Sequence, residues 1–137
     1  MKKDINIPKV EDVCVAVVKE MNDEKTEEVF NVYLINQKDN KIKNTLVTSK
    51  GYGENQSTGE KVNTSILRHF IGDIEPDSFV KIEPIIEEVF GLNNEYWVSF
   101  FEGNQMYDKK FIFLPETIKE ENMITVPLIN KKGVVIL

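Results

Sequence analysis

The sequence predicts an all-β fold, an antiparallel sandwich of two sheets with about seven to nine strands and at most one or two short helical turns. Apolar residues mostly recur at every second position, as in strands that show one face to a core. Turn residues recur about every ten residues, and helical spacing is confined to one short segment. We favour a sandwich over a closed barrel because the expected strands differ in length and a long glycine-rich stretch interrupts them.

The first half of the chain reads as strands separated by polar turns. Residues 13–18 are apolar on both faces, which suits a central strand. Residues 29–35 are rich in aromatic and β-branched side chains, and the polar turn at 22–25 joins the two runs into an opening hairpin. Residues 42–49 form a shorter and more polar run, as expected for a strand at a sheet edge.

The middle of the chain is less regular. We expect residues 51–61, which contain three glycines, to form a mobile, exposed loop. Residues 66–71 fit a strand or a short helical turn, and we favour a strand because Gly72-Asp73 closes the segment. A Pro-Asp-Ser turn at 76–78 then begins an alternating strand at 79–83, an order of pieces that recurs in immunoglobulin-like domains.

The last third contains the clearest local signal, two strands at 96–101 and 106–114 about a glycine-containing loop, which together predict a hairpin. Before it, Pro84 ends its strand or restricts it to a sheet edge, and residues 85–90 have the helical spacing noted above. The remaining expected pieces are a helical turn at 116–121 and two strands at 123–128 and 134–137.

Length and composition predict one cytoplasmic domain. A chain of 137 residues can build one hydrophobic core, so we expect a single β domain over 1–137 with residues 1–9 as an N-terminal arm. This arm lacks the apolar segment of a signal peptide, and no apolar run approaches the ~20 residues of a membrane helix. The single cysteine, Cys14, has no partner in the chain, which fits a reducing compartment.

The charge distribution disfavours nucleic acid as a partner. The net charge of −6 lies entirely in the second half of the chain, because the first 70 residues have equal numbers of acidic and basic side chains. Nucleic-acid binders normally present a basic face to phosphates. This chain has only one arginine, Arg68, and its lysines are scattered.

The titratable residues form no recognisable catalytic or metal-binding motif. Residues 73–77 begin like a calcium loop, but the glycine and the final glutamate of that motif are missing. Cys14 lies in the most apolar strand, where burial suppresses thiol reactivity. Arg68 and His69 are the candidate polar site, although a strand would send them to opposite faces. We therefore predict no catalytic residue, no metal and no cofactor.

The aromatic residues of the predicted hairpin point instead to an interface. Alternation places Trp97 and Phe101 on one face of the strand and Tyr96 and Phe100 on the other, so the hairpin is apolar on both sides. A protein partner or a second copy of the chain would cover one of these sides. The expected interface residues are Tyr96, Trp97, Phe101 and Tyr107.

Three segments, 31–36, 46–53 and 92–100, resemble a family of short, uncharacterised bacterial proteins, and the similarity covers nearly the full chain. Some members of that family are labelled phenylalanyl-tRNA synthetase subunit alpha, so the resemblance implies a part in tRNA charging. A class II synthetase core clamps phosphates with two arginines in separate motifs. Because this chain has Arg68 alone, the resemblance transfers no catalytic residue.

We therefore expect a non-enzymatic, cytoplasmic domain that binds another protein or a copy of itself. An accessory factor in tRNA charging is the first alternative, and it predicts tRNA binding with a steep salt dependence. A small hydrolase or ligand-binding protein that uses Arg68 and His69 is the second. That alternative requires both side chains to line one pocket.

Overall fold

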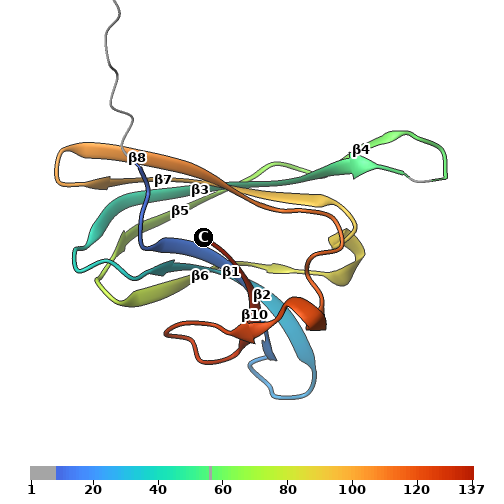
Figure 1. The fold of residues 1–137 in the computed structure, drawn as a ribbon, viewed down its shortest axis with the longest axis horizontal. Coiled ribbons are helices and arrows are strands. Elements are labelled where there is room, and N and C mark those ends of the chain that lie inside the picture. The colour runs from blue at the N-terminus through green and yellow to red at the C-terminus, as the bar shows by residue number, and fades with distance from the viewer. Residues whose placement is uncertain (1–8, 56) are drawn as a thin grey trace, which may run out of the picture.

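Two antiparallel sheets pack face to face in the structure, a computed structural model that describes residues 9–55 and 57–137 (Figure 1). The described residues form ten strands and two 3-10 turns. The strands are β1 (Val13–Met21), β2 (Glu28–Asn36), β3 (Ile42–Glu54), β4 (Lys61–Asn63), β5 (Leu67–Ile74), β6 (Ser78–Ile85), β7 (Asn93–Glu102), β8 (Gln105–Phe113), β9 (Ile124–Thr125) and β10 (Lys132–Ile136). The turns are η1 (Glu87–Val89) and η2 (Glu120–Asn122).

The strand orders confirm the predicted sandwich. The first sheet has the order β6-β2-β1-β10-β9, and the second has the order β4-β3-β7-β8 with β5 also paired to β3. Both orders are open paths, so neither sheet closes into a barrel. The number of strands exceeds the expected seven to nine because it includes two very short strands, β4 with three residues and β9 with two. The immunoglobulin-like character stays a prediction, and the expected arm at 1–9 lies outside the described residues except for Lys9.

The opening hairpin and the central place of β1 agree with the sequence. The β1 and β2 strands pair from Val13 opposite Asn36 to Met21 opposite Glu28. At the turn, the Thr26 backbone N–H donates to Asn22 Oδ1 at 2.8 Å. Both faces of β1 are apolar because both are buried: Val13, Val15 and Val17 lie in the core between the sheets, and the alternate residues lie under Val126 on the outer face.

The expectation of an edge strand at 42–49 is wrong. Strand β3 lies in the middle of the second sheet, between β7 and the pair β4 and β5. Its polar residues, such as Thr48 and Lys50, lie on the outer face of that sheet and do not mark an edge. Polar side chains therefore mark the face of a strand that meets water. Central strands and edge strands can both have such a face, so polarity does not identify an edge.

The loop expected at 51–61 is shorter than predicted, because β3 continues to Glu54 and β4 begins at Lys61. The two strands form a narrow ribbon that projects from the sandwich (Figure 1). Gly51 allows a close approach within this ribbon, since a Cβ atom there would lie 2.9 Å from Thr64 Cγ2. Its backbone N–H donates to Thr64 Oγ1 at 2.7 Å.

The segment at 66–71 is a strand, as favoured above, but Gly72 does not end it. Strand β5 continues to Ile74, and Gly72 takes a positive φ of 85° where the pairing with β3 shifts register. Glycine adopts this conformation without the strain that a Cβ would bring. Pro84 lies in β6 at the edge of the first sheet, as predicted.

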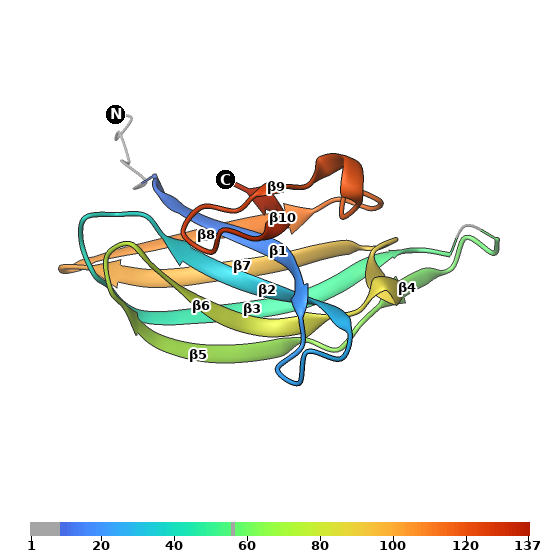
Figure 2. The same cartoon turned by 90° about the horizontal axis from the view of Figure 1, so that it is seen from below.

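The predicted hairpin at 96–114 is confirmed as β7 and β8, joined by a two-residue turn in which Gly103 has a φ of 61°. The helical turn expected at 85–90 is present as the shorter η1, whereas the turn expected at 116–121 is displaced toward the C-terminus, since η2 begins at Glu120. The strand expected at 123–128 is reduced to β9, because the chain beyond it turns across the first sheet (Figure 2).

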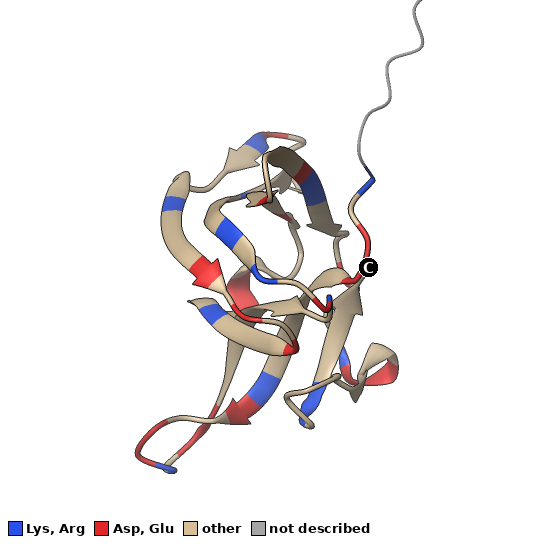
Figure 3. Cartoon of the chain, turned by 90° about the vertical axis from the view of Figure 1, so that its left-hand side faces the viewer, with Lys and Arg blue, Asp and Glu red and all other residues tan. Residues whose placement is uncertain are grey.

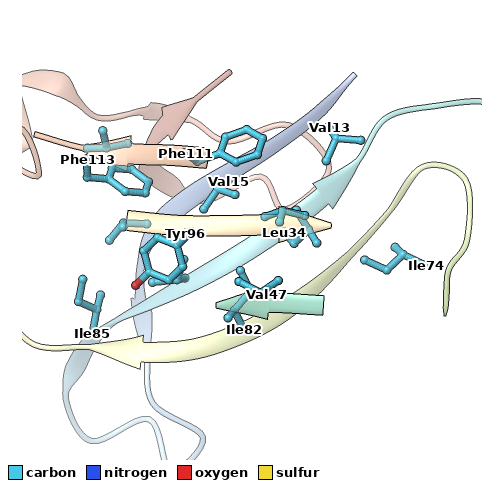
Figure 4. Close-up of a cluster of buried hydrophobic side chains, with 14 of the residues drawn as sticks. Val13, Val15, Leu34, Val47, Ile74, Ile82, Ile85, Tyr96, Phe111 and Phe113 are labelled. Carbon is cyan, nitrogen blue, oxygen red and sulfur yellow. The ribbon is translucent and has the colours of Figure 1, made fainter. Parts of the chain in front are cut away.

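Two apolar clusters result from this arrangement. The larger lies between the sheets and includes Val15, Leu34, Val47, Tyr96 and Phe113 (Figure 4). The smaller lies on the outer face of the first sheet. There Val126 of residues 126–131, which we call the C-terminal segment, covers outward side chains of β1 and β2. Those covered side chains are Cys14, Ala16, Val18, Tyr33 and Ile35.

A buried carboxylate fastens the C-terminal segment to this face. Lys131 Nζ donates to Glu20 Oε1 at 2.8 Å, while Asn31 Nδ2 and the Tyr33 hydroxyl donate to Oε2 at 2.7 and 2.6 Å. Burial opposes ionisation of Glu20, but these three hydrogen bonds outweigh it and lower the pKa of its carboxyl group. The segment is therefore held by charge as well as by apolar contact.

Substitution of Gly133 tests how closely β10 and the C-terminal segment pack on β1. A Cβ at Gly133 would collide with the backbone oxygen of Val17 and lie 2.8 Å from Val126 Cγ2. We expect Gly133→Ala to lower the free energy of unfolding in urea by about 2–3 kcal/mol. The matched control is Gly91→Ala, whose Cβ would meet only the flexible end of Glu116, and we expect a change below about 1 kcal/mol. Equal small effects of the two variants would contradict this packing.

Candidate functional site

Strand β7 divides its aromatic residues between the core and the surface. Trp97 is 43% exposed on the outer face of the second sheet, and Phe101 lies on the same face. Tyr96 is only 2% exposed and packs in the core between the sheets (Figure 4). The alternation predicted for this strand is therefore present, and it sends only part of the expected interface to the surface.

Two of the four expected interface residues are not on that surface. Tyr96 lies in the core, and its hydroxyl donates to Glu83 Oε2 at 3.0 Å. Tyr107 is half-buried and stacks on Phe100 with the ring centroids 5.4 Å apart. The outward interface candidates are thus Trp97 and Phe101.

Neighbouring strands extend the exposed apolar surface around Trp97 and Phe101. Register places Leu46 of β3 beside Phe70 of β5, and Met106 of β8 beside Phe101. Phe70 is the most exposed of the three rings, at 73%. We call the set Leu46, Phe70, Trp97, Phe101 and Met106 the apolar patch.

The apolar patch is comparable in size with the largest apolar patch on a typical monomeric protein. If a ring side chain carries about 200 Å², the three rings alone expose roughly 300 Å². Patches of this size on monomers are often functional. Sequence reasoning missed Leu46, Phe70 and Met106, because only the pairing of four strands brings them to the same outer face as Trp97.

The two sheets differ in how their outer faces are covered. The C-terminal segment covers the outer face of the first sheet through Val126 and Ile129. Over the described residues, no segment packs on the outer face of the second sheet in the same way (Figure 1). As far as residues 9–55 and 57–137 are concerned, the apolar patch is therefore exposed.

Charges of both signs lie beside the apolar patch, since Asp108 of β8 stands opposite Ser99 on the same outer face, between Met106 and Lys110. Lys110 Nζ lies 4.7 Å from the centroid of the Trp97 ring, a cation–π contact. Register places Arg68 on the same outer row as Trp97, through Thr48 between them, and places Lys43 beside Phe101. Acidic and basic residues are also mixed when the whole molecule is viewed end-on (Figure 3).

Arg68 and His69 leave β5 on opposite faces, as the sequence predicted. Arg68 is exposed beside the apolar patch, whereas His69 is turned toward the edge of the core. The structure therefore does not bring the two side chains to one pocket. His69 Nε2 instead lies 2.7 Å from Glu83 Oε1.

Glu83 is the centre of a polar cluster that sequence reasoning missed. Besides His69, it accepts a hydrogen bond from Ser49 Oγ at 2.8 Å and the one from Tyr96 already described. Burial, together with the charge of Glu83, raises the pKa of the Tyr96 hydroxyl. Ser49 donates to the carboxylate and not to His69, so the cluster lacks the hydroxyl-to-imidazole pairing that activates a serine nucleophile.

A β-bulge explains why Glu83 was missed. Strict alternation along β6 would send Glu83 outward with Lys81, but the pairing with β2 shifts register between Val32 and Tyr33. Ile82 is the extra residue, so Glu83 lies opposite the core residue Val32. Bulges of this kind re-aim side chains, and their positions are difficult to read from a sequence.

Other sequence candidates have structural roles or none. At the segment that began like a calcium loop, Asp73 Oδ1 accepts the Asn44 backbone N–H at 3.1 Å, and Glu75 pairs with Lys41. Within residues 9–55 and 57–137 there is no group of three side chains suited to a metal ion. The same part of the chain contains no helix long and apolar enough to cross a membrane.

Comparisons with models of protein families, with curated proteins and with solved structures find no match to this chain. The resemblance to the bacterial family with the synthetase label therefore stays a prediction. We infer function from the surfaces and the polar cluster described above.

The accessibility of Cys14 tests its assignment to a covered face. Burial raises the pKa of its thiol to about 11, so only about one thiol in a thousand is ionised at pH 8. We expect Ellman's reagent to leave the native protein unmodified over minutes and to modify one thiol per chain at once in concentrated guanidinium. Rapid stoichiometric reaction of the native protein would show that the C-terminal segment does not cover Cys14.

Proposed function

We propose that this chain is a non-enzymatic binding domain of the cytoplasm, and that it binds its partner through the apolar patch. The observation that carries this proposal is the uncovered outer face of the second sheet, which exposes Trp97 on the inner strand β7 and Phe70 on the edge strand β5. Burial of exposed apolar surface drives most protein association, and aromatic residues are the commonest hot spots of interfaces.

The geometry of the polar residues supports a binding role over a catalytic one. Arg68 and His69 diverge, and the hydroxyl groups of Ser49 and Tyr96 are both engaged by Glu83. These groups hold the edge of the sandwich together. Cytoplasmic location is supported by the unpaired Cys14, which requires no oxidising compartment.

Beside the apolar patch, the cations Arg68, Lys43 and Lys110 outnumber the acid Asp108, which favours another protein with carboxylates over a face-to-face copy of the chain. A second copy would bring the same excess of cations into the interface, where like charges are unfavourable. A partner with apolar side chains and flanking carboxylates would satisfy both features. Aromatic rings beside cations also suit single-stranded nucleic acid. An accessory role in tRNA charging predicts such a ligand.

Polar substitutions in the apolar patch test the proposal. We expect Phe70→Ser and Trp97→Ser to leave the urea midpoint nearly unchanged, because both side chains are exposed. Each should weaken retention of a partner from a bacterial cytoplasmic extract by at least about tenfold, as loss of a hot spot does. The matched control is Leu114→Ser, which removes an exposed apolar side chain outside the apolar patch and should retain the partner.

Two further measurements separate the alternatives. Light scattering across micromolar concentrations reports self-association, which Phe70→Ser should abolish if a second copy is the partner. Titration with bulk tRNA at low salt tests the accessory role in tRNA charging. Binding that depends steeply on salt and is removed by Arg68→Ala would show that the partner is tRNA and not a protein. If the apolar-patch variants and Leu114→Ser behave alike in all three assays, the proposed function is wrong.

A further inference from the structure

A crevice of about 430 Å³ enters the sandwich at the edge formed by β5 and β6. It lies beyond the contact between His69 and Glu83, where the two strands belong to different sheets and separate. The volume is within the range of small-ligand sites. Its lining comes from both sheets and from η1, and includes Ser49, Leu67, Glu83, Ile86, Val89 and Tyr96.

The polar part of the crevice is a carboxylate that lacks a strong cationic partner. The Glu83 side chain is only 14% exposed. Throughout the described residues it forms no ion pair with lysine or arginine, and its sole basic neighbour is His69. A carboxylate withdrawn from water is costly unless a cation or several hydrogen bonds compensate it.

Glu83 retains capacity for one more donor. A carboxylate offers about four acceptor positions, and the hydrogen bonds described above occupy three of them. Oε1 receives Ser49 and His69, while Oε2 receives only Tyr96. Oε2 therefore keeps an acceptor position that no protein group occupies, and Glu83 lines the crevice through which a donor would arrive.

The walls of the crevice combine apolar side chains with the polar residues Thr64, Ser65 and Asn94. Among the apolar ones, Ile86 is 57% exposed, Leu67 is half-exposed, and Val89, the last residue of η1, packs against the core. Lys50 also lines the crevice, but its Nζ pairs with Glu95 at 3.9 Å. An anion would meet the Glu83 carboxylate, whereas a ligand with a cationic head and a short apolar body would match both parts of the site.

From this geometry we infer that the crevice binds a small organic ammonium, a primary amine on a short alkyl or aryl body. The ammonium group donates to Glu83, and the body packs between Leu67 and Ile86. This site lies at the β5 and β6 edge and is separate from the apolar patch, so neither proposal depends on the other.

The test is a titration of the isotope-labelled full chain with phenethylamine, followed by amide chemical shifts. We expect saturable shifts at amides around the crevice, with a Kd of about 1 mM, the affinity usual for a ligand of this size. The matched probes are 2-phenylethanol, which keeps the body but not the charge and should bind at least about tenfold more weakly, and 3-phenylpropanoate, which should not bind.

Three variants connect the binding to the named side chains. Glu83→Gln removes the charge and should weaken phenethylamine binding at least about tenfold, whereas Glu88→Gln, an exposed glutamate beside the crevice, should leave it unchanged. Leu67→Trp fills the crevice from a half-exposed position, so it tests the site even if Glu83→Gln fails to fold. Equal affinity for amine and alcohol, shifts elsewhere, no saturation, or full binding by Leu67→Trp would each overturn the inference.

Discussion

The structure depends on the burial of one face of β7 between the two sheets. Tyr96, Val98 and Phe100 enter the core, so the residues between them must leave it, because successive side chains of a strand point to opposite faces. A slip of one residue would exchange the two sets and place Trp97 in the core. Pairing of β7 with β3 on one side and β8 on the other fixes the register and so prevents this slip.

Both candidate sites follow from that constraint. The outward residues Trp97 and Phe101 become the centre of an apolar patch on a sheet that no described segment covers. The inward Tyr96 brings a hydroxyl group into the core, where it needs a hydrogen-bond partner. Glu83 on β6 supplies it, and the same carboxylate joins the two sheets through His69 beside the crevice.

The sequence predicted the parts of the fold that have local signals. The β1–β2 and β7–β8 hairpins were foreseen because turn residues and alternation lie close together in the chain. The central place of β3 and the role of Phe70 were not, since both depend on pairing between distant strands. Glu83 was missed for a third reason: a bulge reverses the alternation on which the reading of β6 relied.

The most direct test of this account is the environment of Trp97, the only tryptophan in the chain. In dilute, unpartnered protein, the account predicts red-shifted fluorescence that acrylamide quenches readily, because the ring lies on an open face and is half-exposed. Blue-shifted emission that resists acrylamide until urea unfolds the protein would place Trp97 in the core. The inward and outward faces of β7, and both sites built on them, would then be reversed.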